Sequence, residues 1–323
     1  MVDAFRLRNA PARFSVPLVL RRLLPLKDPA QLLREEAVHA ALREQDSPAP
    51  RVLVVETRAE VIGAPFLVAE RVPGRVPLQE VTRPGQLAAR PMRFPGLIRD
   101  ALFVVAPLLG ETQARLHDLD PEPLRHHLRA AGIAPESVGF DARLAELTRR
   151  VESEQLDGLS PGLGWLHAQR PAPQPDAICH GDLVFTNLCV EAGRLTGVFD
   201  WSNVCLAEPA YDVGATLARL SSRVPNLPWA VDRLMRGVQE RLERRYLRAY
   251  RRRRSLDPER VAYFEACWVL SELTWSGLRL RAGGEPDDAI EHRWLHRATI
   301  EAGVERFAAA TGVRLAPLMP EAP

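Results

Sequence analysis

The pattern of apolar and polar positions divides the chain into a short mixed region and a long helical region. Residues 1–26 alternate weakly, and the apolar run Phe14–Leu20 is typical of a strand. Arg51–Glu56 and Pro65–Val72 have the composition of two further buried strands. Between them and the first strand, Ala30–Leu42 carries apolar residues at helical spacing behind an Asp-Pro pair that favours a helix start. We expect these elements to form a small lobe.

From residue 73 onward the periodicity is mainly helical. Val72–Pro73–Gly74 predicts a hinge, and the proline-rich segment Gly74–Phe94 predicts a loop after it. Leu97–Leu119 predicts a long helix with a kink at Pro107. The other predicted helices are Asp141–Val151, Asp212–Leu220, Ala230–Arg252, Pro258–Leu280 and Asp287–Ala310. The sequence therefore predicts an α+β protein with two lobes, residues 1–72 and 73–323.

One stretch between the helices carries candidate chemistry. It reads HGDLVFTNL and then VFDW, with two short apolar runs that predict a β-hairpin. Asn187 at the hairpin entrance and Asp200 at its exit would lie side by side, with Asp182 one loop away. Magnesium takes hard oxygen ligands and only one or two protein carboxylates, so Asn187 and Asp200 fit that ion. Asp182 would then accept the proton of an attacking hydroxyl, whereas the alternative is a surface hairpin with polar turn residues.

Asp212 is a further candidate near this stretch. It begins the apolar run Val213–Leu220, where a carboxylate can accept backbone N–H bonds as an N-terminal helix residue. The residues therefore predict a capping role, which is compatible with a second role near the hairpin.

The segments HGDLVFTNL, VFDW and EPAYDVGATLARL resemble the aminoglycoside phosphotransferase and choline kinase family, a relative of protein kinases. The resemblance implies a bilobal protein-kinase-like fold. It also implies transfer of the γ-phosphoryl group of ATP, or another nucleoside triphosphate, to a hydroxyl of a small molecule. By position, Asp182 would be the catalytic base, and Asn187 and Asp200 would hold Mg²⁺. His180 and Asp212 would support the catalytic loop.

The small lobe carries a second part of the resemblance. The segments VPLVLRR, REEAVHAAL and GAPFLVAERVPG are similar to the strand, helix and hinge of the family. In kinase-like folds a basic strand residue contacts the ATP phosphates and pairs with a helix glutamate, which by position are Arg21 and Glu35. Glu70 and Val72 at the hinge are the other implied nucleotide contacts. The alternative is an exposed strand arginine and a solvated helix glutamate.

The small lobe also departs from the family pattern. No glycine occurs before Gly63, so the loop that covers the ATP phosphates is missing, and the chain begins only about twenty residues before Arg21. Either the chain is truncated upstream, or the lobe is shortened and nucleotide binding is weakened. A pseudokinase or binding module of the same fold is therefore the alternative function.

A stripe on the predicted helix 258–280 is the candidate acceptor site. Glu265, Trp268, Glu272 and Trp275 recur at helical spacing, apart from the core face. Carboxylates and indoles would suit a cationic, partly apolar acceptor, and the resemblance implies an acceptor pocket among the C-terminal helices. The alternative is that the tryptophans are core residues and the glutamates rim residues. The identity of the acceptor and the oligomeric state stay open.

Composition narrows the remaining possibilities. With 323 residues, 46% hydrophobic content and a net charge of +2, the chain has the composition of a globular protein. Arg241–Arg254 holds eight arginines, but a solvated helix face in an arginine-rich chain explains it better than nucleic-acid binding. The apolar run Ala101–Leu109 is too short to span a membrane, and the four cysteines form no metal or disulfide pattern. We expect a cytoplasmic protein without a nucleic-acid or membrane partner.

Overall fold

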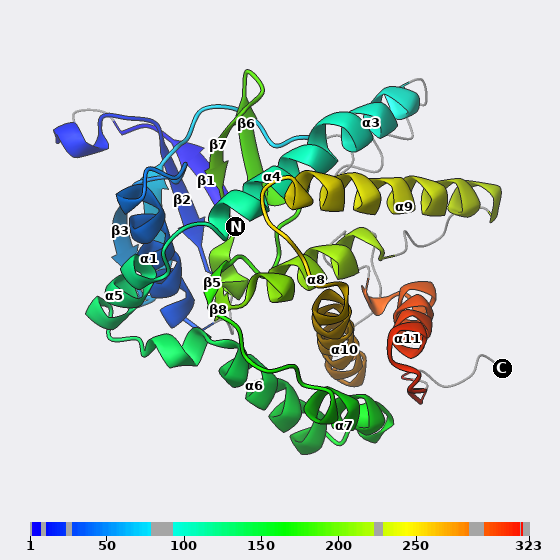
Figure 1. The fold of residues 1–323 in the computed structure, drawn as a ribbon. Coiled ribbons are helices and arrows are strands. Elements are labelled where there is room, and N and C mark those ends of the chain that lie inside the picture. Colours follow the sequence, from blue (N-terminus) through cyan, green and yellow to red (C-terminus); the bar gives the residue numbers. More distant parts are fainter. Residues whose placement is uncertain are drawn as a thin grey trace.

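The computed structural model describes residues 2–7, 11–23, 28–78, 93–222, 229–283, 294–316 and 318. Within these residues a lobe of strands and one helix adjoins a larger, mainly helical lobe (Figure 1). The predicted α+β fold with two lobes is therefore confirmed. The exact boundary at residue 72 remains a prediction.

The small lobe is built on a four-stranded antiparallel sheet in the order β1-β2-β4-β3. Its elements are β1 Val2–Phe5, β2 Leu18–Arg22, α1 Ala30–Glu44, β3 Val52–Glu56 and β4 Phe66–Glu70. One strand, β1, thus precedes the strand that carries Arg21. Asp28 Oδ1 accepts a hydrogen bond from the Ala30 N–H at 2.9 Å, which fits the predicted helix start.

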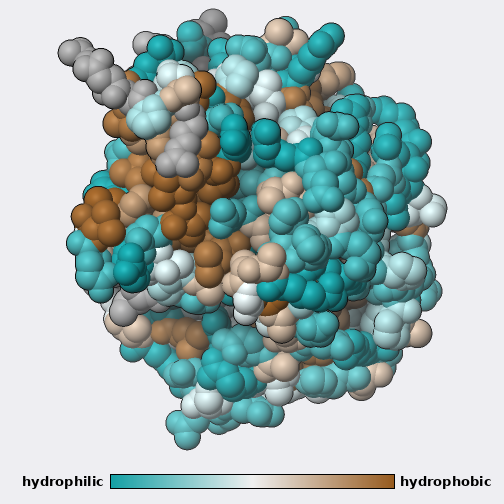
Figure 2. All heavy atoms as spheres, turned by 90° about the vertical axis from the view of Figure 1, so that its left-hand side faces the viewer, coloured by the Kyte–Doolittle hydropathy of each residue, from teal (hydrophilic) through white to brown (hydrophobic). Residues whose placement is uncertain are grey.

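The two faces of this sheet have different partners. Leu67 and Ala69 of β4 point to α1 and pack with Leu32, because side chains alternate along a strand. Phe66 and Val68 point the other way and form a separate small cluster. Figure 2 shows an extended apolar area on the side of the molecule that lies to the left in Figure 1. Several large apolar side chains of this lobe are exposed: Val2, Leu7, Val16, Val61 and Ile62.

The large lobe is a packed set of helices around one hydrophobic core. The helices are α3 Phe94–Asp100, α4 Ala106–Leu116, α5 Glu122–Ala130, α6 Phe140–Ser153, α7 Ser160–Ala168, α8 Pro209–Leu220, α9 Trp229–Arg251, α10 Pro258–Arg281 and α11 Arg297–Thr311. α4 packs along α9, and α8 packs against α10 (Figure 1). Trp201, Tyr246 and Phe307 are fully buried in this core.

Two helix predictions differ from the structure in detail. The kink expected at Pro107 is a π-helical turn, Ala101–Val105, directly before α4. A proline ring clashes with the carbonyl four residues earlier, and the wider turn falls at that carbonyl. The last helix begins at Arg297, and the predicted start at Asp287 lies outside the described residues, as does most of the predicted loop Gly74–Phe94.

The predicted hinge is attached to the β-hairpin of residues 188–198 in the large lobe. Arg75 and Val190 exchange backbone hydrogen bonds of 3.0 and 2.9 Å, and Thr196 Oγ1 donates to the Pro73 carbonyl at 2.6 Å. Gly74 has φ +107°, and a Cβ there would lie 2.5 Å from the Val190 oxygen. Only glycine fits this contact, so the chain path between the lobes is fixed at this residue.

Candidate active site

The predicted catalytic loop, residues 180–187, lies between two short pairs of strands. β5 (Ala177–Cys179) pairs with β8 (Cys205–Ala207), and β6 (Leu188–Glu191) pairs with β7 (Arg194–Val198). The hairpin turn at residues 192 and 193 has positive φ at both positions, as a tight two-residue turn requires. The Phe199 N–H donates to the Asn187 carbonyl at 2.8 Å, so the exit of the hairpin lies beside its entrance. The structure thus brings Asn187 and Asp200 to the same end of the hairpin, as predicted.

His180 joins the catalytic loop to the segment that carries Asp200. Its Nε2 lies 2.8 Å from the Phe199 carbonyl oxygen, and its Nδ1 lies 3.2 Å from the Asp182 backbone N–H. Because a carbonyl oxygen can only accept and a backbone N–H can only donate, the ring is protonated at Nε2. The imidazole also contacts the Trp201 ring at a centroid distance of 4.5 Å. His180 therefore supports the loop and does not face the open site.

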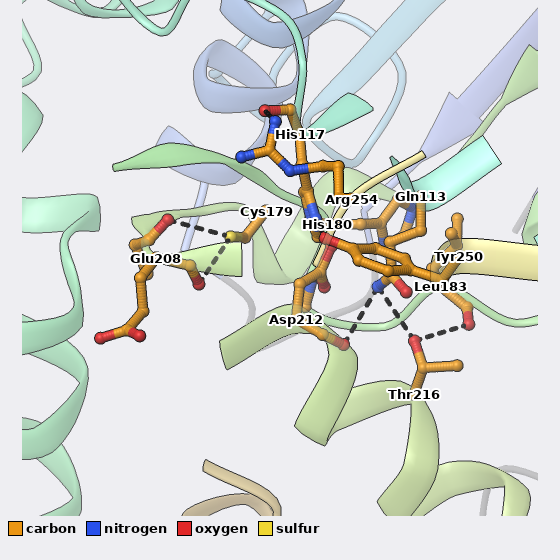
Figure 3. A network of polar contacts seen from close by, with 12 residues as sticks. Gln113, His117, Cys179, His180, Leu183, Glu208, Asp212, Thr216, Tyr250 and Arg254 are labelled. Carbon is orange, nitrogen blue, oxygen red and sulfur yellow. Dashed lines mark hydrogen bonds and ion pairs between the residues drawn. The ribbon is translucent and has the colours of Figure 1, made fainter. Parts of the chain in front are cut away.

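Asp212 is fully buried and binds the same loop from the other side (Figure 3). Its carboxylate accepts the backbone N–H groups of His180 at 2.9 Å and Gly181 at 2.7 Å. The prediction that it caps its own helix is wrong, because α8 already begins at Pro209 and the carboxylate points to the loop. Burial acts to raise the pKa of Asp212, but the His117 hydrogen bond and nearby imidazoles outweigh it and hold the pKa below its ordinary value.

A set of buried polar residues that the sequence did not reveal surrounds Asp212. His117 Nε2 lies 3.0 Å from Asp212 Oδ2, and its Nδ1 lies 2.7 Å from the Tyr250 hydroxyl. Gln113 donates through Nε2 to the Asp212 carbonyl and to Thr216 Oγ1. Spacing within one helix cannot show that His117 has a partner 95 residues away.

The thiol of Cys179 also lies next to this network. Ligand atoms of His117, Cys179 and Asp212 fall within 4.8 Å of one another, which the cysteine spacing did not predict. The thiol donates to the Ala207 carbonyl at 3.3 Å, and burial raises its pKa well above the ordinary value. The structure therefore shows the Cys179 thiol as a buried hydrogen-bond donor beside the network.

Asn187 and Asp200 present the donors that a hard cation prefers. Asn187 Nδ2 donates to the Asp182 carbonyl at 2.8 Å, which directs the amide oxygen away from that carbonyl. Asp200 is the more open of the two, with 47% of its side chain exposed. Its backbone is left-handed, with φ +60°, a strained conformation for a residue with a side chain. One amide oxygen and one carboxylate fit a magnesium ion that also binds phosphate oxygens.

Arg21 connects the small lobe to this donor set. Its guanidinium forms an ion pair with Glu35 on α1, and its Nη2 lies 3.0 Å from Asp200 Oδ1. His39, one turn after Glu35, is buried, and burial together with Arg21 and His180 lowers its pKa to about 3. The structure thus brings Arg21, Glu35 and Asp200 together, although the sequence separates Arg21 from Asp200 by 179 residues.

Asp182 is held by a residue that sequence reasoning missed. Arg219 Nε, at the end of α8, lies 3.0 Å from Asp182 Oδ1, and Arg219 Nη2 lies 2.8 Å from Glu272 Oε1. Glu272 belongs to the stripe predicted on α10, so the structure links that stripe to the predicted base. An arginine seven residues after Asp212 gives no sequence signal in a chain so rich in arginine.

The other members of the α10 stripe have partners of their own. Glu265 forms an ion pair with Arg306 of α11, and its pKa is raised by burial against the effect of that arginine. Trp268 lies 5.4 Å from the Tyr211 ring, and Trp275 lies 5.7 Å from the Arg279 guanidinium. Both glutamates of the stripe are therefore paired with protein arginines.

The arginines directly after the end of α9 also form ion pairs within the fold. Arg252 pairs with Glu111, while Arg253 and Arg254 pair with Asp118. Arg254 Nη1 also donates to the His117 carbonyl at 2.9 Å, so the segment after α9 contacts the buried polar network around Asp212.

Among the helices of the described residues, none has the length and apolar character needed to cross a membrane.

The small sheet lobe and the larger helical lobe form a kinase-like fold. The profile of the phosphotransferase enzyme family (APH) matches residues 3–264, and the chain belongs to this family. The matched residues include the small lobe as well as the loop with Asp182, so both regions belong to the part of the chain that the family shares.

Individual relatives are distant. Aminoglycoside 3'-phosphotransferase of Streptomyces fradiae is 27% identical over 237 residues, which are 69% of this chain and 74% of that protein. Acyl-CoA dehydrogenase family member 11 of Rattus norvegicus is 28% identical over 254 residues, covering 73% of this chain and 30% of the relative. Family member 10 of Mus musculus is 24% identical over 212 residues, 62% of this chain and 18% of the relative. The chain spans less than a third of these two dehydrogenase family members.

Solved structures share the fold across almost the whole chain. A thermostable mutant of aminoglycoside phosphotransferase APH(4)-Ia in its apo form superposes with a TM-score of 0.59 at 16% identity, covering 96% of both chains. A ternary complex of a thermostable mutant of that enzyme with ADP and hygromycin B gives a TM-score of 0.56 at 17% identity, covering 93% of this chain and 94% of the other. At such identities the likeness shows a common fold.

Proposed function

We propose that this protein transfers the γ-phosphoryl group of ATP, with Mg²⁺, to a hydroxyl group of a small molecule. The observation that carries the proposal is the hydrogen-bonded loop that joins Asp182, Asn187 and Asp200. Asn187 binds the Asp182 carbonyl, and His180 binds both the Asp182 N–H and the carbonyl before Asp200. These bonds would hold the proposed base and the two proposed metal donors in fixed positions relative to one another, as phosphoryl transfer requires.

The nucleotide would lie between the lobes. Arg21, steadied by Glu35, would contact the phosphates, and its planar guanidinium suits two phosphate oxygens at once. Glu70 and Val72 lie where β4 leaves the sheet, and they would contact the base of the nucleotide. The backbone N–H groups of Glu70 and Arg71 bind Arg51 and Pro17, whereas no described residue binds the Val72 N–H. That N–H is therefore the candidate donor to the adenine ring.

Different residues of the chain would have different roles in the phosphoryl transfer. Asn187 and Asp200 would hold the metal, which when bound neutralises charge on the transferring group. Asp182 orients the acceptor hydroxyl and accepts its proton as the oxygen attacks phosphorus. His180 and Asp212 keep the loop in place and touch no reacting atom.

The acceptor would bind beside α10. Aminoglycoside 3'-phosphotransferase is among the relatives, and hygromycin B is bound in one structural neighbour, which supports a polyhydroxylated small molecule. Glu272 of the α10 stripe is linked to Asp182 through Arg219. The other members of the predicted stripe are Glu265, Trp268 and Trp275. We retain the members of this stripe as the proposed acceptor residues, with Glu272 acting together with Arg219.

The test compares the purified chain with its Asp182→Asn variant. We expect magnesium-dependent release of ADP from ATP in the unaltered chain. A fall of about 10²–10⁴-fold is expected in the variant, the usual contribution of a general base. Nucleotide affinity should stay unchanged, because Asn keeps the size of the side chain. Equal rates in the two proteins would remove Asp182 as the base.

The alternative is a binding module of the same fold that does not hold ATP. It is motivated by the sequence before Gly63, which contains no glycine. It predicts a folded chain with no affinity for nucleotide with or without magnesium.

A further inference from the structure

Arg219 pairs with carboxylates from two different parts of the large lobe. It lies at the end of α8, and its two nitrogen contacts reach Asp182 in the catalytic loop and Glu272 on α10. The three side chains are mostly enclosed, with exposed fractions of 19% for Arg219, 24% for Asp182 and 13% for Glu272. Burial acts to lower the pKa of Arg219, but Glu272 and Asp182 outweigh it and raise the pKa, so the guanidinium stays charged.

The contact with Arg219 completes the immobilisation of Asp182. Its backbone N–H is bound by His180, and its backbone carbonyl is bound by Asn187. Its side-chain Oδ1 faces Arg219. Because Oδ1 is turned to Arg219, Oδ2 is the oxygen left to face an acceptor hydroxyl. A hydroxyl that approaches Asp182 therefore meets one defined oxygen atom.

From this arrangement we infer that Arg219 is the positioning residue of the base, and that it also couples the base to the acceptor helix. It holds the carboxylate through Oδ1, so that Oδ2 faces the acceptor hydroxyl, and its second contact fixes Glu272 in the proposed acceptor site. This inference rests on the proposed phosphotransfer. Fixing the carboxylate matters because a displacement of about 1 Å at a reacting group can cost about 100-fold in rate.

Arg306 of α11 gives a matched control, because it also pairs with a glutamate of α10. It also bridges two carboxylates, Glu265 on α10 and Glu243 on α9, but it contacts none of the loop residues. Its replacement removes the same kind of bridge at another point of α10. A loss caused only by weaker helix packing should therefore occur in both arginine variants.

The experiment measures release of ADP from MgATP with water as the acceptor, so that no acceptor need be known. We expect Arg219→Gln to lower the rate about tenfold or more, with the KM for ATP unchanged, and Arg219→Lys to recover part of the loss. Arg306→Gln should keep the rate of the unaltered chain. In an Asp182→Asn background, Arg219→Gln should cause no further loss, because the residue acts through the base.

Three results would overturn the inference, each in a different way. An unchanged rate in Arg219→Gln, beside a large loss in Asp182→Asn, would contradict the role of Arg219 alone. Equal losses in Arg219→Gln and Arg306→Gln, or a full loss on top of Asp182→Asn, would make Arg219 a general packing residue. No MgATP turnover in the unaltered chain would contradict the proposed function itself, together with the role of Arg219 that depends on it.

Discussion

At the scale of single residues, buried polar groups organise the catalytic loop. Asp212 keeps a charged carboxylate in the core because His117 and two backbone N–H groups donate to it. A buried charge without such donors would cost several kcal/mol. On the small-lobe side, His39 is equally buried but stays neutral, with a pKa of about 3. These two residues give the protein its most specific responses to pH.

We predict that His39 makes the folded state sensitive to mild acid. In the unfolded chain a histidine binds a proton below about pH 6.5, whereas folded His39 does so only near pH 3. Between these values the unfolded state binds more protons, so stability falls as pH falls, by about 1.4 kcal/mol per pH unit. From pH 7 to pH 5 the His39→Gln variant should therefore gain about 2 kcal/mol relative to the unaltered chain. Urea unfolding at each pH measures this.

His126→Gln is the control, because it removes an exposed histidine and leaves the buried one in place. If the unaltered chain and both variants lose stability in parallel on acidification, the interpretation of His39 is wrong.

At the scale of elements, the hinge and the β6–β7 hairpin form one attached unit. Gly74 lies where the hinge comes closest to the hairpin. The residue before it, Pro73, accepts a hydrogen bond from Thr196, and the residue after it, Arg75, exchanges backbone hydrogen bonds with Val190. The hairpin carries Asn187 at its entrance and Asp200 at its exit. Because the hinge is bonded to this hairpin, the hinge is held in a fixed position relative to the proposed metal donors. A change at the hinge is therefore expected to affect both stability and nucleotide binding.

Gly74→Ala tests this attachment. The added methyl would lie 2.5 Å from a backbone oxygen at a φ of +107°, so we expect a loss of about 3 kcal/mol in unfolding free energy. Gly63→Ala is the matched control, because Gly63 also has positive φ but nothing lies within 4 Å of the added atom. It should lose only about 1 kcal/mol. Equal urea midpoints for the two variants would show that the hinge does not contact the hairpin.

The elements also show how far the sequence could be interpreted. The β6–β7 hairpin and most helices followed from periodicity and turn residues within a short window. His117 and Arg219 did not, because each acts on a residue far away in the chain, and its own neighbours carry no sign of it. The capping role given to Asp212 failed for the same reason, since its partners lie on the catalytic loop and not on its own helix.

At the scale of the whole molecule, the proposed nucleotide site depends on contact between the lobes. Arg21 of the small lobe reaches both Glu35 beside it and Asp200 of the large lobe. The family match, which covers residues 3–264, includes both sides of this contact. The central claim is therefore that the two lobes together hold a magnesium–nucleotide complex at Asp200.

The most direct measurement is the melting temperature of the purified chain with and without millimolar ATP and magnesium. A ligand at about 100 times its dissociation constant adds about 2.7 kcal/mol, which raises the melting temperature by several degrees. We predict a rise that needs both ATP and magnesium and that is lost in Asp200→Ala. The same melting temperature under all conditions, or a rise that survives in Asp200→Ala, would contradict the account.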